Sequence, residues 1–430
     1  MVKLPHWPIP YFSLPANLSL ERMNELMKCM GNPHRLLPPT IHVAGTNGKG
    51  STIAFLKSIL QSAGYKVHTY TSPHIIRYNE RICLAGQEID DDSLFRSIEY
   101  ARLAADGMAL TFFEGTTAAA FHAFANHEAD VLLLETGMGG EFDATNIITN
   151  PIATIITSID YDHMEYLGPN LKDIARAKSG IMKQGSPCII SLQYQEPLEA
   201  LLESAISKRI GVFTGGVDWN VRELSESFLF IDDQGETEFP MPSLLGHHQV
   251  VNAGAAIACL QCLEGFKIRY RDIIQGITEA KWMGRLHKIS PPISLKLPLS
   301  WELWIDGAHN VGGAAALANN LDLWKGKKVV LINGRTKDRD IEGFLAPFLG
   351  KVESISCVNV MSEPKSEDPE KISEIAHDLG FKDVLCFDNI SDAIMYYVNC
   401  AKEGGDITLK ESVVILIAGS LYLFADIMKA

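Results

Sequence analysis

A glycine-rich segment between an apolar run and a helical pattern constrains the fold of this chain most strongly. The segment reads His-Val-Ala-Gly-Thr-Asn-Gly-Lys-Gly-Ser-Thr at residues 42–52, and residues 41–44 enter it like a buried strand. The apolar residues that follow recur at spacings of three and four, as on one face of a helix: Ile53, Leu56, Ile59, Leu60 and Ala63. A strand, a glycine-rich turn and a helix in this order predict an α/β protein with a phosphate-binding loop.

This loop can hold phosphates because its glycines let backbone N–H groups turn inward at the N-terminus of a helix. Gly45, Gly48 and Gly50 supply that freedom, and Lys49 is placed to reach the outer phosphates. The segment departs from the usual pattern G-x-x-x-x-G-K-[ST], since Val43 stands where the first glycine belongs and Gly50 follows the lysine. We interpret it as a variant nucleotide loop.

The charge balance argues against two classes of partner. The chain has 430 residues, of which 47% are apolar and 21% charged, and its formal net charge is -14. Nucleic acids and membrane surfaces are also anionic, so we expect neither as a partner, and an anionic substrate needs a local cationic pocket. Residues 1–12 carry no apolar core of a signal peptide. The apolar run at residues 413–425 is too short to span a bilayer.

The cysteines favour a reducing compartment. Eight are scattered along the chain, and Cys259 and Cys262 form a CxxC in an apolar helical stretch with no second pair nearby. We interpret these two as buried packing residues rather than metal or redox ligands. We therefore expect a cytoplasmic protein, and we expect it to be a monomer.

Apolar runs alternate with helical segments in the first two thirds of the chain, which predicts a mostly parallel sheet with helices on both faces. The strands that we expect lie at residues 40–44, 67–70, 131–135, 153–158 and 188–191. Residues 228–231 and 237–239, separated by a turn, predict a hairpin in a small antiparallel patch, and a helix should follow from about 250 to 263. This forms the expected nucleotide-binding domain, residues 1–290.

A second α/β series follows a proline-rich segment that runs from Pro291 and Pro292 to Pro298, the best linker candidate. The strands expected here lie at residues 303–305, 329–332, 354–360, 384–387 and 413–417. We predict a smaller, Rossmann-like C-terminal domain at residues 291–430.

Polar residues follow several of these strands, at the edge where open parallel sheets bind ligands. Glu135 ends one strand, and a carboxylate there commonly holds the Mg²⁺ of a bound nucleotide. Asp162 and His163 follow the next strand and are candidates for a second cation site. Ser72 could give a hydroxyl to the metal. From position alone, we interpret Lys178 as a helix C-terminal lysine that complements the helix dipole.

Two further sites belong to the second series. Asp306 ends a strand in Asp-Gly-Ala-His-Asn, at another carboxyl edge that would face the nucleotide if the domains close. Arg285, in Trp-Met-Gly-Arg, could reach a phosphate across such a cleft.

Together these motifs resemble the folylpolyglutamate synthase/dihydrofolate synthase family, relatives of the Mur peptide ligases. The matches run in order along the chain: HVAGTNGKGST at 42–52, TSPH at 71–74, NERI at 79–82, TFFEGTTAAAF at 111–121, ETGMGGEFDATN at 135–146, DH at 162–163, AKSGIMK at 177–183, GHHQVVNAGAAI at 246–257, WMGR at 282–285, DGAHN at 306–310 and AGSLYL at 418–423. Mur ligases usually place threonine directly after the loop lysine. The order Lys49, Gly50, Ser51 is similar to the folate branch.

The resemblance implies a nucleotide and metal site. It assigns the ATP phosphates and the rest of the nucleotide to Gly48, Lys49, Gly50, Ser51, Asn252, Arg285 and Asp306. It assigns two Mg²⁺ ions to Ser72, Glu135, His163 and Lys178. In this family the lysine at the position of Lys178 is carried as a carbamate, which is anionic and can coordinate a metal. Lys178, His163 and Lys49 then become the expected catalytic residues.

The resemblance also implies a pterin pocket. It falls on Ser19, Leu20, Glu21, Thr111, Phe112, Phe113, Glu114, Phe142, Asp143 and Ala144. Phe113 offers a stacking face for a pterin, and His309 and Ser420 match positions of the second domain tied to the cleft. Two positions depart from the family pattern: Glu141 stands where arginine is usual, and Ala177 replaces glutamate before the lysine. The first reverses a charge beside Asp143, in a pocket that the resemblance expects to accept an anionic pterin.

The reaction implied is ATP-dependent amide formation through an acyl phosphate, with L-glutamate as the amine. We expect glutamate to be added both to dihydropteroate and to reduced folates, with these small molecules and ATP as the only partners. A folylpolyglutamate synthase without the dihydropteroate activity is the nearest alternative. A Mur-type ligase for a cell-wall precursor and a P-loop NTPase are the others.

Overall fold

The computed structural model describes residues 19–290, 293–403 and 411–429, and Pro291 and Pro292 of the expected linker lie outside these ranges. The chain forms two compact units. The first comprises the chain up to Ser243 together with His248–Lys281, and the second comprises Leu244–His247 and the chain from Trp282 onward. Each unit contains its own sheet and its own apolar core.

The first unit is built on an eight-stranded sheet in the order β4-β3-β2-β5-β1-β6-β7-β8. Its strands are β1 (Thr40–Ala44), β2 (Val67–Tyr70), β3 (Ile82–Leu84), β4 (Gln87–Glu88), β5 (Val131–Glu135), β6 (Ala153–Ile156), β7 (Cys188–Ile190) and β8 (Val212–Thr214). Within this order, β2, β5, β1, β6, β7 and β8 run parallel to one another. At the edge, β3 pairs antiparallel with β2, and β4 pairs antiparallel with β3. The mostly parallel sheet predicted from the alternating apolar runs is therefore confirmed.

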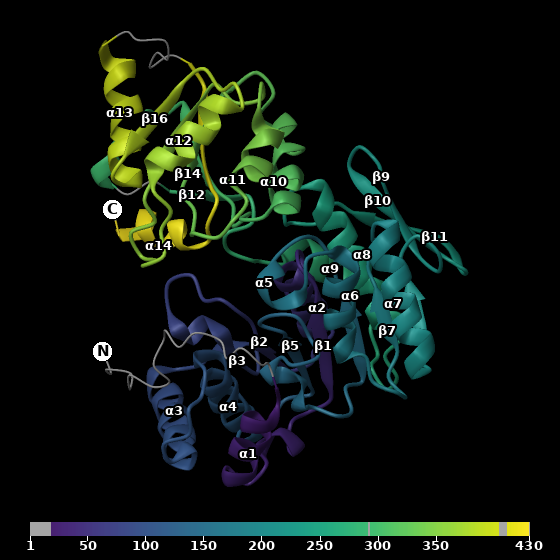
Figure 1. Cartoon of the computed structure of the whole chain (residues 1–430). Helices are drawn as coiled ribbons and strands as arrows, with labels where there is room; N and C mark the ends of the chain where they lie inside the picture. The colour runs from purple at the N-terminus through teal and green to yellow at the C-terminus, as the bar shows by residue number, and fades with distance from the viewer. Residues whose placement is uncertain (1–18, 291–292, 404–410, 430) are drawn as a thin grey trace. The chain divides into compact units, whose positions relative to one another are not determined.

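Helices cover both faces of this sheet (Figure 1). They are α1 (Glu21–Cys29), α2 (Lys49–Ser62), α3 (Asp91–Ala105), α4 (Phe112–Ala125), α5 (Met164–Leu167), α6 (Leu171–Lys178), α7 (Gln195–Lys208), α8 (His247–Gln261) and α9 (Tyr270–Glu279). Side chains alternate between the faces of a strand, so Leu132 and Leu134 of β5 meet α1, α3 and α4 while the opposite face packs on α2 and, beyond it, α9.

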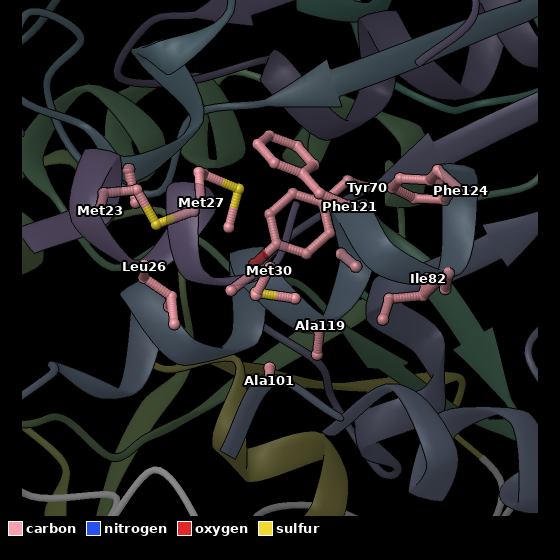
Figure 2. Packing of buried hydrophobic residues seen from close by; sticks show 14 of the residues in the cluster. Met23, Leu26, Met27, Met30, Tyr70, Ile82, Ala101, Ala119, Phe121 and Phe124 are labelled. Atoms are coloured by element: carbon pink, nitrogen blue, oxygen red, sulfur yellow. The ribbon is translucent and has the colours of Figure 1, made fainter. Parts of the chain in front are cut away.

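The core beneath α1 and α4 is rich in methionine and phenylalanine. Figure 2 shows Phe121 and Phe124 of α4 and Tyr70 of β2 in one buried cluster with Met23, Met27 and Met30, in which Phe124 lies on the side away from Met23. These side chains are buried. The cluster fixes α4 against the sheet and thereby sets the position of Phe112 and Phe113 in the first turn of that helix.

A separate antiparallel sheet confirms the predicted hairpin. It has the order β11-β10-β9, with β9 (Asn220–Glu223), β10 (Ser227–Asp232) and β11 (Gly235–Pro240). The helix expected after it is α8, which begins at His247.

The second unit contains a six-stranded sheet in the order β12-β13-β17-β14-β15-β16. Its elements are β12 (His287–Ile289), β13 (Trp301–Ile305), α10 (Val311–Ala318), β14 (Lys328–Asn333), α11 (Ile341–Leu345), β15 (Ser354–Val358), α12 (Pro369–Asp378), β16 (Val384–Phe387), α13 (Ile390–Glu403), β17 (Val413–Ala418) and α14 (Tyr422–Lys429). All neighbours are parallel except β12, which pairs antiparallel with β13. The two α/β units confirm the expected fold class. No helix in the described ranges is both long and apolar enough to cross a bilayer.

Candidate active site

The glycine-rich loop connects the buried central strand β1 to α2. Its Thr46 and Asn47 N–H groups donate to the Ser158 carbonyl, at 2.9 and 3.2 Å. Gly48 has a φ of 90° and lies so close to the Asn252 amide that a Cβ would collide with it. Only glycine fits such a position without strain. The loop therefore lies directly against Asn252, which the family resemblance predicts in the nucleotide site.

Lys49 is the first residue of α2 and its ammonium group lies over the loop. The Nζ donates to the carbonyls of Gly45 and Thr46, at 3.2 and 3.3 Å, and is 3.9 Å from Glu135 Oε1. A cation held at a helix N-terminus, above N–H groups that can face an anion, is the arrangement that neutralises polyphosphate charge.

The carboxyl ends of β2, β5 and β1 meet at this edge, because the three strands are parallel neighbours. Glu135, the last residue of β5, is buried, and its Oε2 accepts the Ser72 N–H at 3.0 Å. Glu135 thus lies within reach of both Lys49 and Ser72. The structure brings together the loop lysine, the strand-end carboxylate and the serine, three residues that the sequence separates by up to 86 positions.

Lys178 ends α6, as its position suggested, but its side chain does not face solvent. It is buried, and its Nζ donates to the Gly45 carbonyl at 2.8 Å. Burial holds the pKa of Lys178 well below its usual value, and the nearby Lys49 cation lowers that pKa further. Lys178 is therefore a helix C-terminal lysine, as its position indicated, but its side chain is buried against the glycine-rich loop.

His163 and Asp162 lie on the loop after β6. His163 precedes α5 with a left-handed φ of 51°, and its Nε2 lies 3.9 Å from Asp162 Oδ1. About a third of the His163 side chain is exposed, at 34%. The pair is a carboxylate–imidazole arrangement at the start of α5, in which the Asp162 side chain is only 8% exposed and His163 is partly exposed.

A buried chain of hydrogen bonds connects β1 to the loop that follows β5. Asp143 accepts the N–H groups of Gly137 and Met138, both at 2.9 Å, and the Thr145 hydroxyl at 2.5 Å. His42 Nε2 lies 2.8 Å from that hydroxyl oxygen. Because the Thr145 proton is given to Asp143, His42 must donate its Nε2–H. Asp143, predicted in the pterin pocket, therefore organises the backbone of the loop that follows β5.

Replacing His42 with glutamine is expected to flatten the pH dependence of stability. Burial, with a smaller contribution from the Lys183 cation, lowers the pKa of His42 to about 3. At about pH 6.5 and below, the unfolded chain then binds more protons than the folded one. This histidine should therefore lower the free energy of unfolding by about 2 kcal/mol as the pH falls from about 8 to about 5. Glutamine keeps a donor toward Thr145 but does not titrate. Urea unfolding of both proteins at the two pH values measures this change in the free energy of unfolding. An equal change in the wild type and in the glutamine variant would contradict the lowered pKa of His42.

Aromatic side chains line the start of α4. A Cβ on Gly137 would collide with the Phe113 ring, at 2.5 Å, and the Phe113 ring centroid lies 6.0 Å from that of Tyr70. The Arg81 guanidinium lies over the neighbouring Phe112 ring, 5.3 Å from its centroid. A flat ring system could stack here with a cation nearby.

The Glu114 carboxylate already accepts hydrogen bonds from other residues of the chain. Thr111 caps α4 and its N–H donates to Glu114 at 2.7 Å, while the Arg22 guanidinium of α1 bonds the same carboxylate at 2.9 and 3.1 Å. The other residues expected in the pocket lie at the start of α1 or after β5: Ser19, Leu20, Glu21, Phe142 and Ala144. Phe142 is 47% exposed, so its ring faces solvent.

The remaining predicted residues belong to the second unit, at the carboxyl ends of β13 and β17. Asp306 is buried and accepts the Ala308 and Leu286 N–H groups, both at 2.8 Å. Arg285 lies beside Gly307, where a Cβ would approach its Nη1 to 2.5 Å. His309 Nδ1 lies 2.8 Å from the Gly307 carbonyl, and Ser420 is buried. These residues therefore share one edge of the second sheet.

Sequence reasoning assigned no role to two arginines of the first unit, Arg22 and Arg81. Arg81 donates from Nε to His74 Nδ1 at 2.8 Å, and burial lowers the pKa of His74 to about 4, so this histidine stays a neutral acceptor. The signal for Arg81 was the NERI motif. Arg22 lies in an ordinary amphipathic helix and gave no signal.

The comparison with protein families agrees with this architecture. The Mur ligase middle domain matches residues 43–260, and the Mur ligase glutamate ligase domain matches residues 299–421. The first of these matches covers more than half of the chain. The fold and the site therefore define an ATP-dependent acid–amino-acid ligase of the Mur type.

Whole-chain relatives narrow the class. The dihydrofolate synthase/folylpolyglutamate synthase of Bacillus subtilis is 32% identical, with 95% of this chain and 94% of the relative covered. The structure of E. coli FolC with DHPP and ADP has a TM-score of 0.85 at 31% identity, covering 97% of this chain and 94% of that one. This chain belongs to the folylpolyglutamate synthase/dihydrofolate synthase family, as its motifs predicted. A structure of a bifunctional member with Mn, AMPPNP and L-glutamate matches with a TM-score of 0.84 at 27% identity, covering 97% and 95% of the two chains.

Proposed function

We propose that this protein joins L-glutamate to dihydropteroate and to reduced folates in an ATP-dependent reaction. The observation that carries the proposal is the gathering of Lys49, Ser72, Glu135 and Lys178 around one phosphate-type loop. The bifunctional names of the Bacillus subtilis and Escherichia coli relatives, each 32% identical, support both activities.

The loop residues Gly48–Ser51 would bind the ATP phosphates. Their support is the N-terminus of α2, the ammonium group of Lys49 and the contact of Gly48 with Asn252. Arg285 and Asp306 are the proposed nucleotide contacts of the second unit, and His309 and Ser420 lie at the same sheet edge. For each of these the proposal rests on the matching motif and on its place at a carboxyl edge.

The oxygen ligands available fit Mg²⁺. Ser72 and Glu135 are neighbours that offer a hydroxyl and a carboxylate, the hard donors that this ion prefers. The described residues contain no group of three or more His, Cys, Asp or Glu side chains that could hold a metal. A full ligand set must therefore include other donors, and we propose His163 and a carbamate on Lys178 for a second ion. When bound, Mg²⁺ would supply charge neutralisation to the phosphates.

Lys178 is suited to carbamate formation. Its lowered pKa increases the fraction of neutral amine, the form whose nitrogen lone pair attacks the carbon of CO2. The new N–C bond forms as the nitrogen loses a proton, which leaves an anionic carbamate. The Lys49 cation, which disfavours a charged Lys178, would favour that anion.

The pterin would bind against the first turn of α4. Phe113, fixed by Gly137 and Tyr70, offers a ring face, and Arg81 over Phe112 offers a cation. Glu141 is exposed on the loop after β5. Burial and the Lys208 cation lower the pKa of Lys183, and the charge of Glu141 opposes this in part, so the two side chains interact electrostatically.

In the proposed reaction, an oxygen of the substrate carboxylate forms a bond to the γ-phosphorus and ADP departs, which gives an acyl phosphate. The glutamate amine then forms the amide bond at the acyl carbon, phosphate departs and the amine proton is lost. Lys49 would offset charge on the transferring phosphoryl group, and the rigid loop would hold it in line.

Purified protein with ATP, Mg²⁺ and L-glutamate tests the proposal when dihydropteroate and tetrahydrofolate are offered separately. We expect amide product and ADP in equal amounts with both acceptors. Product from tetrahydrofolate alone would instead support a folylpolyglutamate synthase, the name of the Lacticaseibacillus casei relative at 29% identity. ATP turnover without either acceptor or without glutamate would overturn the ligase.

The cysteines and the net charge support a proposal on the protein's location and partners. All eight cysteines are free, which agrees with a reducing compartment. Cys259 is buried in α8 as expected, whereas Cys262 follows that helix and is only partly buried, so the expectation that both are buried is wrong for Cys262. With a net charge of -14, we propose a cytoplasmic monomer whose partners are small molecules rather than nucleic acid or membrane.

A further inference from the structure

Arg335 is an unusual side chain for the core of the second unit. It follows β14 by two residues and is fully buried, with a relative exposure of 0%. Its Nε and Nη1 have no hydrogen-bond partner in the part of the chain that the structure describes. Burial lowers its pKa only to about 10, so it remains a cation at neutral pH. An uncharged side chain of similar length would fill this space without burying a charge, so packing alone does not account for an arginine here.

The guanidinium group contacts two loops. Its Nη2 donates to the carbonyl of His309, at 3.3 Å, and to that of Asp340, at 3.1 Å. The Phe344 ring of α11 lies beneath it, with 4.2 Å between the guanidinium carbon and the ring centroid. One side chain therefore connects the loop after β13 to the start of α11.

The aliphatic part of Arg335 lies beside a third loop. A Cβ on Gly419, whose φ is 119°, would collide with the Gly334 carbonyl and the Asn333 amide and would lie 3.2 Å from Arg335 Cγ. Gly419 donates its N–H to the Ala308 carbonyl at 3.0 Å and directly precedes Ser420. Arg335 thus lies between the loop that carries His309 and the loop that carries Ser420.

We propose that Arg335 is a positioning residue for the edge of the second sheet that carries His309 and Ser420. Its Nη2 bonds the carbonyl of His309 on one side and its stem lies against Gly419 on the other, so that His309 and Ser420 keep a defined spacing. This proposal rests on the proposed function, because only that function gives this edge, with its proposed nucleotide contacts, a part in the reaction. Arg335 itself is enclosed and acts through these loops rather than on substrate.

Replacing Arg335 with methionine keeps the length of the stem and removes the donors. Because displacement of about 1 Å in a positioned group can cost on the order of 10²-fold in rate, we expect R335M to lower kcat/KM for glutamate by about that factor. We also expect amide hydrogen exchange at residues 307–310 and 419–420 to rise by about tenfold, since local opening free energy governs exchange. The exchange measurement needs no turnover, so it tests the positioning role even if the proposed reaction is wrong.

Tyr397→Phe provides a matched control in the same unit. The buried Tyr397 hydroxyl bonds Ser354 and Ser356 at 2.9 and 2.8 Å, on β15 rather than at the three loops. We expect Y397F to lower the melting temperature but to leave kcat/KM and the exchange of these loops unchanged. R335K keeps the charge but presents one compact donor, so it should fall between R335M and wild type, and it serves if R335M does not fold. Wild-type exchange and kcat/KM in R335M, or in R335K where R335M does not fold, would overturn the proposal.

Discussion

Replacing Lys49 with alanine is expected to lower kcat by about 10²- to 10³-fold, the range that follows from removing one preorganised charge at a reacting group. The Lys49 ammonium lies at the N-terminus of α2, 3.2 Å from the Gly45 carbonyl and 3.9 Å from Glu135. Without it, the negative charge on the transferring phosphoryl group has no side-chain cation in the loop. Steady-state ADP release at saturating ATP and glutamate measures the effect.

Lys57→Ala is the control for this substitution. Lys57 is on the same helix, but its Nζ lies 3.2 Å from Cys83 Sγ, away from the loop. It should keep kcat close to that of the wild type. If K49A kept wild-type kcat with an unchanged KM for ATP, the loop would not be the phosphate site.

Replacing Lys178 with alanine is expected to lower activity roughly 100-fold or more, because a carbamate at this position would orient a metal and its ligands. Added acetate or propionate should restore part of the activity, since the shortened side chain leaves room for a free carboxylate near Gly45. The wild-type protein should also incorporate labelled CO2 at Lys178, which ¹³C NMR with labelled bicarbonate can detect.

Lys183→Ala is the control for K178A, because it removes a neighbouring lysine that is not expected to carry a carbamate. Lys183 donates to Asn146 Oδ1 at 2.8 Å and to the Gly180 carbonyl at 3.2 Å, so its loss should weaken the loop without any response to acetate. Wild-type activity in K178A, or a labelled carbamate signal that persists in K178A, would refute the role of Lys178.

Most strands of four or more residues could be predicted from the sequence, whereas most of the shortest could not. The exceptions are β7, which has three residues and matches the run expected at 188–191, and β9, which has four residues and was not predicted. The runs at 67–70 and 384–387 match β2 and β16 at both ends. In contrast, β4 has two residues and β3, β8 and β12 have three each, too few for an alternating pattern to become visible. Their pairing with neighbours, rather than their own composition, makes them strands.

The candidate site likewise combines residues that the sequence indicated with contacts that only the structure shows. The residue types at strand ends indicated Glu135 and Ser72, because a parallel sheet gathers its carboxyl ends at one edge. The contacts of Glu114 with Arg22 and of His42 with Thr145 join residues 92 and 103 positions apart, and no local pattern predicts them.

The glycine-rich loop, its lysine and the polar strand ends are local features, so the sequence by itself determined the α/β class, the nucleotide loop and the family. The tertiary structure decided which of these groups meet. The strand order β2-β5-β1 places Ser72, Glu135 and Lys49 together, and the packing of α6 brings Lys178 to the Gly45 carbonyl, 133 residues away. The ionisation of Lys178 follows from that burial and from the neighbouring cation, and both depend on distances in space rather than along the chain.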